Sequence, residues 1–162
     1  MIPYREYMKE CILVLDNIRS VENVGSIFRT AEGLGVSQII LAGITPTPLD
    51  RFGRERKDFS KVSLGAEKLV KWKYEKDTES IIGGLKKEGF FIVALEQTKS
   101  SRDLKDINVP DKFALIVGNE VEGVSKKALD ASDEIVEIPM AGEKESLNVS
   151  VATGVTLFKL LA

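Results

Sequence analysis

Polar residues that could take part in catalysis follow apolar runs in the second half of this 162-residue sequence. Residues 117–123 read Val-Gly-Asn-Glu-Val-Glu-Gly, residues 138–140 read Ile-Pro-Met, and residues 146–150 read Ser-Leu-Asn-Val-Ser. The first two segments come at the ends of runs typical of buried strands, at 113–117 and 135–138. Ligands of open α/β sheets bind at the ends of strands. We therefore expect a site that combines a carboxylate, carboxamides and backbone groups.

Residues 118–125, Gly-Asn-Glu-Val-Glu-Gly-Val-Ser, come close to a glycine-rich phosphate loop. Val124 stands where that loop needs a lysine, and Glu120 and Glu122 would place two carboxylates beside a polyanion. A nucleotide-binding switch is therefore disfavoured. The other alternative is an ordinary turn, in which the two glycines supply permissive backbone geometry.

The scarcity of histidine and cysteine limits the chemistry. The sequence has no histidine and one cysteine, Cys11, which excludes an internal disulfide, a histidine-based zinc site and a histidine general base. No metal site is expected, and Cys11 should be a buried apolar residue. With 43% hydrophobic and 30% charged residues, no run of membrane-span length and a polar N-terminal segment, the sequence predicts a cytoplasmic protein with no membrane contact and one domain over residues 1–162.

Positive charge is concentrated in one segment, although the net charge is −2 and the isoelectric point is about 5.4. Residues 51–73 contain eight Lys or Arg residues against three Asp or Glu residues, a surplus of 8 − 3 = 5. The connection over 43–57 carries two prolines and ends in this basic segment. A phosphate-binding surface would lie here. A charged loop exposed to solvent is the alternative.

Apolar runs and helical periodicities alternate along the chain. Strands are predicted at 12–15, 38–42, 72–74, 90–95, 113–117 and 135–138, and helices at 24–34, 63–70, 78–87, 125–131 and from 146 or 147 to 161. Asn23 is a possible cap of the first helix and Asp77 or Thr78 of the third. This alternation predicts an α/β fold with a mostly parallel sheet flanked by helices.

Two helices carry features that need explanation. Arg29 lies on the polar face of the first helix, and spacing alone indicates an arginine exposed to solvent. The last helix has a wide apolar face, with Gly154 in its middle at a cost of about 1 kcal/mol relative to alanine. A close approach by another helix would explain the glycine, and we expect a subunit interface. The face comprises Leu147, Val151, Val155 and Phe158.

Three motifs occur in a specific order: Asn23-Val-Gly-Ser-Ile-Phe-Arg29-Thr-Ala with Gly35, Val117-Gly-Asn-Glu120 with Gly123, and Ile138-Pro-Met140 with Ser146-Leu-Asn148-Val-Ser150. In this order they resemble the motifs of the SpoU, or TrmH-type, RNA ribose 2'-O-methyltransferases of the SPOUT superfamily. The resemblance implies a homodimer, a C-terminal trefoil knot and S-adenosylmethionine bound in the knot loops. It also implies transfer of a methyl group to the ribose 2'-hydroxyl of a tRNA or rRNA nucleotide, with no separate RNA-binding domain in this chain.

The resemblance also assigns residues. Those implied to contact the cofactor are Leu95, Gly118, Ile138, Met140 and Leu147. Those implied to form the catalytic surroundings are Arg29, Asn23, Glu120, Ser146 and Asn148. Because a guanidinium stays protonated, with a pKa above about 12, we expect Arg29 to bind the neighbouring phosphate and stabilise charge on the 2'-oxygen.

The basic segment is the expected RNA-binding surface, formed by Arg51, Arg54, Arg56, Lys57 and Lys61. The alternative function is a catalytically silent RNA-binding or assembly module that keeps the knotted fold. The retention of Arg29 together with Asn23, Glu120 and Asn148 disfavours that alternative, because a silent module has no need of all four.

Overall fold

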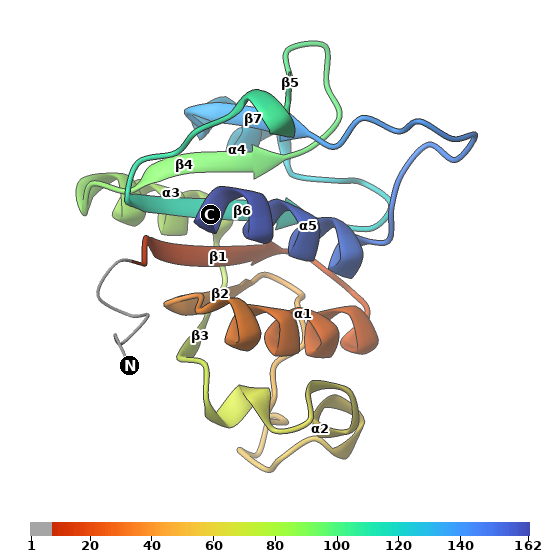
Figure 1. Ribbon diagram of the computed structural model, residues 1–162. Helices are drawn as coiled ribbons and strands as arrows, with labels where there is room; N and C mark the ends of the chain where they lie inside the picture. The colour runs from red at the N-terminus through yellow and green to blue at the C-terminus, as the bar shows by residue number, and fades with distance from the viewer. Residues whose placement is uncertain (1–7) are drawn as a thin grey trace, which may run out of the picture.

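The computed structural model of the protein describes residues 8–162. Its centre is a seven-stranded sheet in the order β3-β2-β1-β6-β4-β7-β5 (Figure 1). Each strand pair is parallel. The strands are β1 (Glu10–Asp16), β2 (Gln38–Ala42), β3 (Trp72–Glu75), β4 (Phe91–Leu95), β5 (Arg102–Asp103), β6 (Lys112–Gly118) and β7 (Glu134–Glu137). The predicted α/β class with a parallel sheet is confirmed.

Helices cover both faces of this sheet. They are α1 (Val21–Leu34), α2 (Lys57–Ser63), α3 (Thr78–Lys87), α4 (Lys126–Ala131) and α5 (Val149–Leu161), with short 3-10 helices η2 (Ala66–Lys68) and η3 (Leu104–Asp106). Figure 1 shows α1 and α5 side by side in front of the sheet, with α3 and α4 behind it. Among residues 8–162, no helix is both long enough and apolar enough to cross a membrane.

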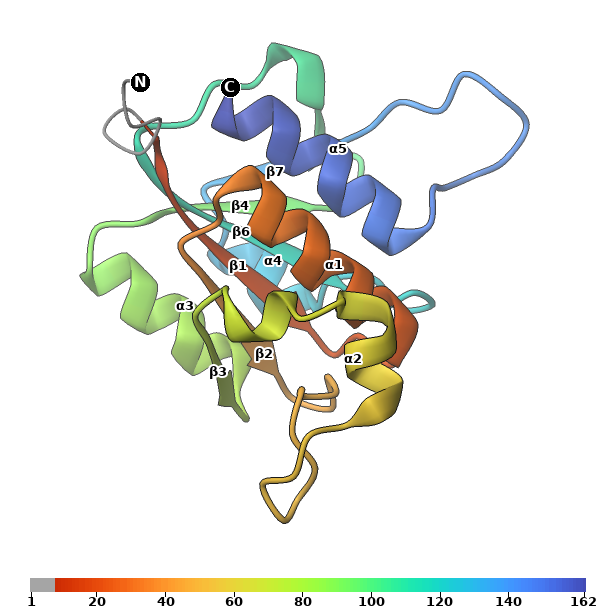
Figure 2. The same cartoon turned by 60° about the horizontal axis from the view of Figure 1, so that its bottom comes forward.

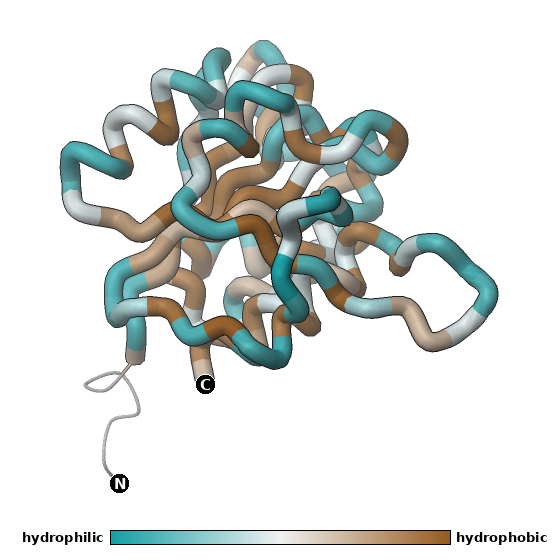
Figure 3. Tube along the Cα trace, turned by 90° about the horizontal axis from the view of Figure 1, so that it is seen from above, coloured by the Kyte–Doolittle hydropathy of each residue, from teal (hydrophilic) through white to brown (hydrophobic). Residues whose placement is uncertain are grey.

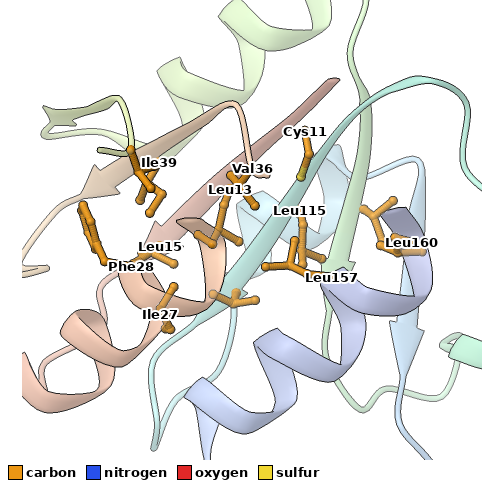
Figure 4. Packing of buried hydrophobic residues seen from close by; sticks show 14 of the residues in the cluster. Cys11, Leu13, Leu15, Ile27, Phe28, Val36, Ile39, Leu115, Leu157 and Leu160 are labelled. Atoms are coloured by element: carbon orange, nitrogen blue, oxygen red, sulfur yellow. The ribbon is translucent and has the colours of Figure 1, made fainter. Parts of the chain in front are cut away.

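Alternate residues of each central strand enter two separate cores. In β1, Leu13 and Leu15 pack with Phe28 of α1 and Leu157 of α5, as Figure 4 shows. The intervening Ile12 and Val14 pack on the other face, against α3 and α4. Because both faces are covered, the strands read as continuous apolar runs. Figure 3 shows the same distribution, with apolar residues along the inner strands and polar residues on the projecting loops.

The helix predicted over 63–70 is wrong. The helical segment α2 ends at Ser63 because Leu64 takes up left-handed backbone with φ 52° and Gly65 follows with φ 86°. Only the short η2 follows. The strand β5 was also missed, because two polar residues, Arg102 and Asp103, carry no apolar pattern.

The predicted cap of the first helix and the predicted start of the last helix also need correction. The cap of α1 is Ser20, whose hydroxyl accepts from the N–H of Asn23 at 3.2 Å. The side chain of Asn23 therefore has no capping role and is available for other contacts. The last helix begins at Val149, because Asn148 caps it by accepting from the N–H of Ser150 at 2.9 Å.

The glycine in the last helix has a partner inside the chain. A Cβ atom at Gly154 would lie 3.3 Å from Cγ2 of Thr30 in α1, which is tighter than most side-chain contacts. The close approach inferred from the sequence is therefore made by α1 of the same chain. Gly154 gives no support to a subunit interface.

The parallel arrangement places the carboxyl ends of all strands at one edge of the sheet. Asp16, at the end of β1, is buried there and joins three elements. Its carboxylate accepts from Thr78 Oγ1 at 2.7 Å at the start of α3, and from the N–H of Ser125 at 3.0 Å just before α4. This edge is therefore fixed by buried, satisfied hydrogen bonds.

Candidate active site

A cavity of about 580 Å³ opens at this edge. It lies between the ends of β4, β6 and β7 and the segment 138–148 that leads to α5, seen in Figure 1 as the blue loop that projects from the sheet. The residues that line it and were named from the sequence are Leu95, Gly118, Glu120, Ile138, Met140, Ser146, Leu147 and Asn148. All five residues expected to contact a cofactor, from the ends of β4 and β6 and from the segment 138–148, thus line one cavity.

One wall of the cavity is a closed backbone turn. Asn119 and Gly123 exchange two hydrogen bonds, at 3.1 and 2.9 Å, and a Cβ atom at Gly118 would overlap the backbone of Gly123 and Val124. The N–H of Val124 donates to Glu96 Oε2 at 2.8 Å. Because these amides are already bonded within the protein, the turn does not offer the row of unpaired amides that a phosphate loop needs.

The predicted catalytic residues include a connected chain of polar side chains. Oε1 of Glu120 accepts from Asn23 Nδ2 and from the N–H of Ser20, and Oε2 accepts from the N–H of Arg19, each at 3.3 Å. Asn23 Oδ1 accepts in turn from Asn148 Nδ2 at 3.1 Å. The start of α1, the turn after β6 and the cap of α5 are thereby joined beside the cavity.

Glu120 is held in its charged form. Burial alone would raise its pKa, but hydrogen bonds from its own N–H, the Asn23 amide and the N–H groups of Arg19 and Ser20 outweigh burial and lower the pKa below its usual value. At neutral pH the side chain is therefore a carboxylate with acceptor capacity only.

The structure separates Arg29 from this cluster. Arg29 is exposed on α1 and is not among the residues that line the cavity. Within the described part of the chain its guanidinium makes no ion pair. Six residues separate it from Asn23, which corresponds to about 9 Å along a helix and a different face.

The cavity is also lined by Glu96 and Gln97, which belong to none of the three motifs. Gln97 Nε2 donates to the backbone oxygen of Glu145 at 2.9 Å and so ties the outlet of β4 to the segment 138–148. The available signal was the polar run that directly follows the apolar strand β4, the same signal that identified residues after β6. No metal centre is found among residues 8–162, because no three or more of their His, Cys, Asp or Glu side chains are placed to hold an ion.

The basic segment predicted to bind RNA lies mainly between β2 and α2. Arg54 pairs with Asp50 at 2.9 Å and Arg56 with Asp58 at 2.7 Å. These pairs neutralise part of the excess positive charge that the sequence places in this segment. The other three predicted residues, Arg51, Lys57 and Lys61, form no ion pair with any residue from 8 to 162.

Comparison with known proteins identifies the family. Residues 10–158 match the model of the SpoU rRNA Methylase family. The chain belongs to this family. An uncharacterized tRNA/rRNA methyltransferase of Borreliella burgdorferi is 35% identical over 150 residues, covering 92% of this chain and 62% of that protein.

Two further proteins are similar to this chain, one in sequence and one in fold. The tRNA (guanosine(18)-2'-O)-methyltransferase of Thermus thermophilus is 30% identical, covering 96% of this SpoU chain and 76% of that protein. The AdoMet-bound rRNA methyltransferase from Sinorhizobium meliloti has a TM-score of 0.83 at 30% identity, covering 93% of this chain and 55% of that one. The chain thus spans less than two thirds of the Borreliella and Sinorhizobium proteins.

Proposed function

We propose that this SpoU-family chain is an S-adenosylmethionine-dependent methyltransferase that acts on the ribose 2'-hydroxyl of a tRNA or rRNA nucleotide. The observation that carries the proposal is the meeting of three distant segments at one cavity, where Glu120, Asn23 and Asn148 are joined by hydrogen bonds. The Thermus relative, named for 2'-O-methylation of tRNA guanosine, supports the reaction. The AdoMet-bound Sinorhizobium relative supports the cofactor.

The cavity suits this cofactor in size and lining. A volume of about 580 Å³ lies within the range of about 300–1,000 Å³ usual for small-molecule sites. Apolar side chains offer an adenine surface, and Gly118 lines the cavity with backbone alone. A side chain at Gly118 would overlap the facing turn. The holding residues would be Leu95, Gly118, Ile138, Met140 and Leu147. When bound, the cofactor supplies a sulfonium-activated methyl group.

The polar residues orient the RNA ribose. Asn23 and Asn148 are fixed by each other and by Glu120, which restricts their rotamers before substrate binds. Glu120 acts as a positioning carboxylate, because a general base works best with a pKa near the operating pH and its pKa is lowered instead. Ser146 contributes a hydroxyl to the same wall of the cavity. In this proposal Arg29, although it lies outside the cavity of its own chain, binds the phosphate next to the target ribose and stabilises charge on the 2'-oxygen.

RNA binding and self-association complete the proposal. RNA is bound by the segment that contains Arg51, Arg54, Arg56, Lys57 and Lys61, within the domain itself. The chain forms a homodimer through α5, whose Val151, Val155 and Phe158 are 52%, 44% and 71% exposed. The C-terminal trefoil knot expected from the family resemblance is part of this proposal.

The test combines cofactor binding with product analysis. Calorimetry should show binding of S-adenosylmethionine or its demethylated product, with no comparable binding of ATP. Tritiated methyl groups should pass from labelled cofactor to bulk tRNA or rRNA, and alkaline hydrolysis should leave the label in alkali-resistant dinucleotides. Label on bases would overturn the ribose assignment. RNA binding without any methyl transfer would favour the silent module.

A further inference from the structure

An exposed aromatic ring stands at the tip of the segment between β2 and α2. Phe52 is 66% exposed, and the guanidinium groups of Arg51 and Arg54 lie over its ring in cation–π contact, with their central carbons 4.8 and 5.0 Å from the ring centroid. It also lines a second cavity of about 720 Å³ together with Tyr74, itself exposed. Figure 2 shows this segment extending away from the body of the protein below β2 and α2.

The tip is a turn ordered by hydrogen bonds within residues 49–55. Asp50 Oδ1 accepts from the N–H of Phe52 at 2.8 Å and from the N–H of Arg54 at 2.9 Å. The N–H of Gly53 donates to the backbone oxygen of Asp50 at 3.0 Å, and Leu49 bridges Glu55 across the turn in antiparallel fashion. The backbone that carries the ring is therefore ordered before any ligand arrives, which lowers the ordering cost of binding.

Charge alone explains little of this surface. Arg54 and Arg56 are paired with Asp50 and Asp58, so their net contribution to phosphate attraction is reduced. The net charge of the chain is −2. Binding of RNA to this surface therefore needs a contact that does not depend on net charge. Guanidinium groups beside an aromatic ring provide one, because nucleobases stack on both kinds of group.

The turn is connected to the candidate active site. The strands are parallel, so the segment after β2 leaves the sheet at the same edge as the turn after β6. Asn17 joins the two: its Oδ1 accepts from the N–H of Ile44 at 3.0 Å, and its backbone oxygen accepts from Asn119 Nδ2 at 2.8 Å. Asn119 lines the cavity.

We propose that Phe52, flanked by Arg51 and Arg54, is a stacking platform for an unpaired nucleobase of the RNA substrate. The inference rests on the proposed function, because it takes RNA as the substrate. The base must be unpaired, since a base inside an A-form helix has both faces covered by its neighbours and only looped or single-stranded bases can be splayed onto a side chain. The contact tolerates any base, because every base has a π face.

The test uses Phe52→Ala and Phe52→Leu in the full chain, with a single-stranded 2-aminopurine-labelled RNA and a blunt RNA duplex of equal length as probes. We expect both variants to weaken binding of the single strand about tenfold, because stacking of one base is worth that much or more by alanine substitution. Leucine keeps apolar bulk but lacks the π face, so it should not rescue binding. Duplex affinity and the salt dependence of single-strand binding should not change, because no phosphate contact is removed. The 2-aminopurine fluorescence should be quenched by wild-type protein and much less by either variant.

The matched control is Leu69→Ala, which removes another exposed apolar side chain, 73% exposed, away from both cavities. It should bind both RNAs like wild type. Single-strand affinity and quenching that are unchanged in both Phe52 variants would overturn the platform, as would full rescue by leucine. The proposed function is assessed separately in the same samples by calorimetry with S-adenosylmethionine and by methyl transfer from the wild-type protein. A wild-type protein that transfers methyl groups, with Phe52 variants that bind RNA normally, would therefore contradict only the platform.

Discussion

At the scale of single residues, Arg29 is the predicted catalytic side chain whose role most needs a test, because it is exposed on α1 and does not line the cavity. We predict that Arg29→Ala folds and binds S-adenosylmethionine normally but loses methyl transfer about a hundredfold or more, since one electrostatic contact to the transition state is worth that much. Arg29→Lys should recover little, because an ammonium cannot engage two oxygens as a guanidinium fork does. Single-turnover transfer to tRNA and rRNA measures this.

The control for Arg29 is Arg102→Ala, which removes another exposed arginine, paired with Glu134 at 2.7 Å. It should transfer methyl groups like wild type, since exposed ion pairs contribute little. Transfer by Arg29→Ala at the wild-type rate would return Arg29 to the role of a solvent-exposed charge.

Also at the residue scale, the lowered pKa of Glu120 gives a pH dependence with a defined sign. Because its folded-state pKa lies below the usual 4.5, ionised Glu120 stabilises the fold above the unfolded-state pKa, and this contribution is lost as pH falls through the folded-state value. We predict that Glu120→Gln is less stable than wild type at pH 7, and that the gap closes below about pH 4.5. The midpoints of urea denaturation, measured for both proteins at pH 7 and at pH 3, report the difference in stability. A gap that persists unchanged to pH 3 would show that the hydrogen bonds do not depend on charge.

At the scale of elements, the end of β6 and the turn that follows it must approach each other without any side chain between them. We predict that Gly118→Ala destabilises the protein by more than about 2 kcal/mol and weakens cofactor binding, because its Cβ atom would overlap the backbone of Gly123 and Val124. Gly33→Ala in α1 is the matched control, with no atom within 4 Å of the added Cβ. It should be neutral or stabilising by up to about 1 kcal/mol. Chemical denaturation midpoints compare the two, and equal stabilities would exclude the overlap.

At the scale of the whole molecule, α5 presents an apolar stripe that no segment within residues 8–162 covers. Val151, Val155 and Phe158 recur at helical spacing and are exposed, while Leu157 and Leu160 of the same helix are buried in the core. We predict that wild-type protein has twice the 17.9 kDa chain mass by light scattering at micromolar concentration, and that Phe158→Asp is monomeric, because burying an unpaired carboxylate is costly. Leu69→Asp, another exposed apolar position, should remain dimeric. A monomeric wild type would contradict the interface.

The sequence by itself determined most of the strands and helices and several of the residues that line the cavity. Apolar runs are local, so the strand over 38–42 and the helix over 78–87 are found at the predicted bounds. The motifs place Gly118, Ile138 and Met140 where strands end, and parallel strands end at a common edge. The segment 63–70 was misassigned because the left-handed backbone of Leu64 has no sequence signature of the kind that a glycine gives.

Only the tertiary structure decided which side chains meet. Asn23 contacts Glu120 across 97 positions of sequence and Asn148 across 125 positions. Glu96, which follows β4, accepts a hydrogen bond from the N–H of Val124 in the turn after β6. The close approach at Gly154 is made by α1 of the same chain and not by a second subunit. Periodicity reports which face of an element is buried, but the partner across that face depends on the order of strands and the packing of helices, which no local pattern contains.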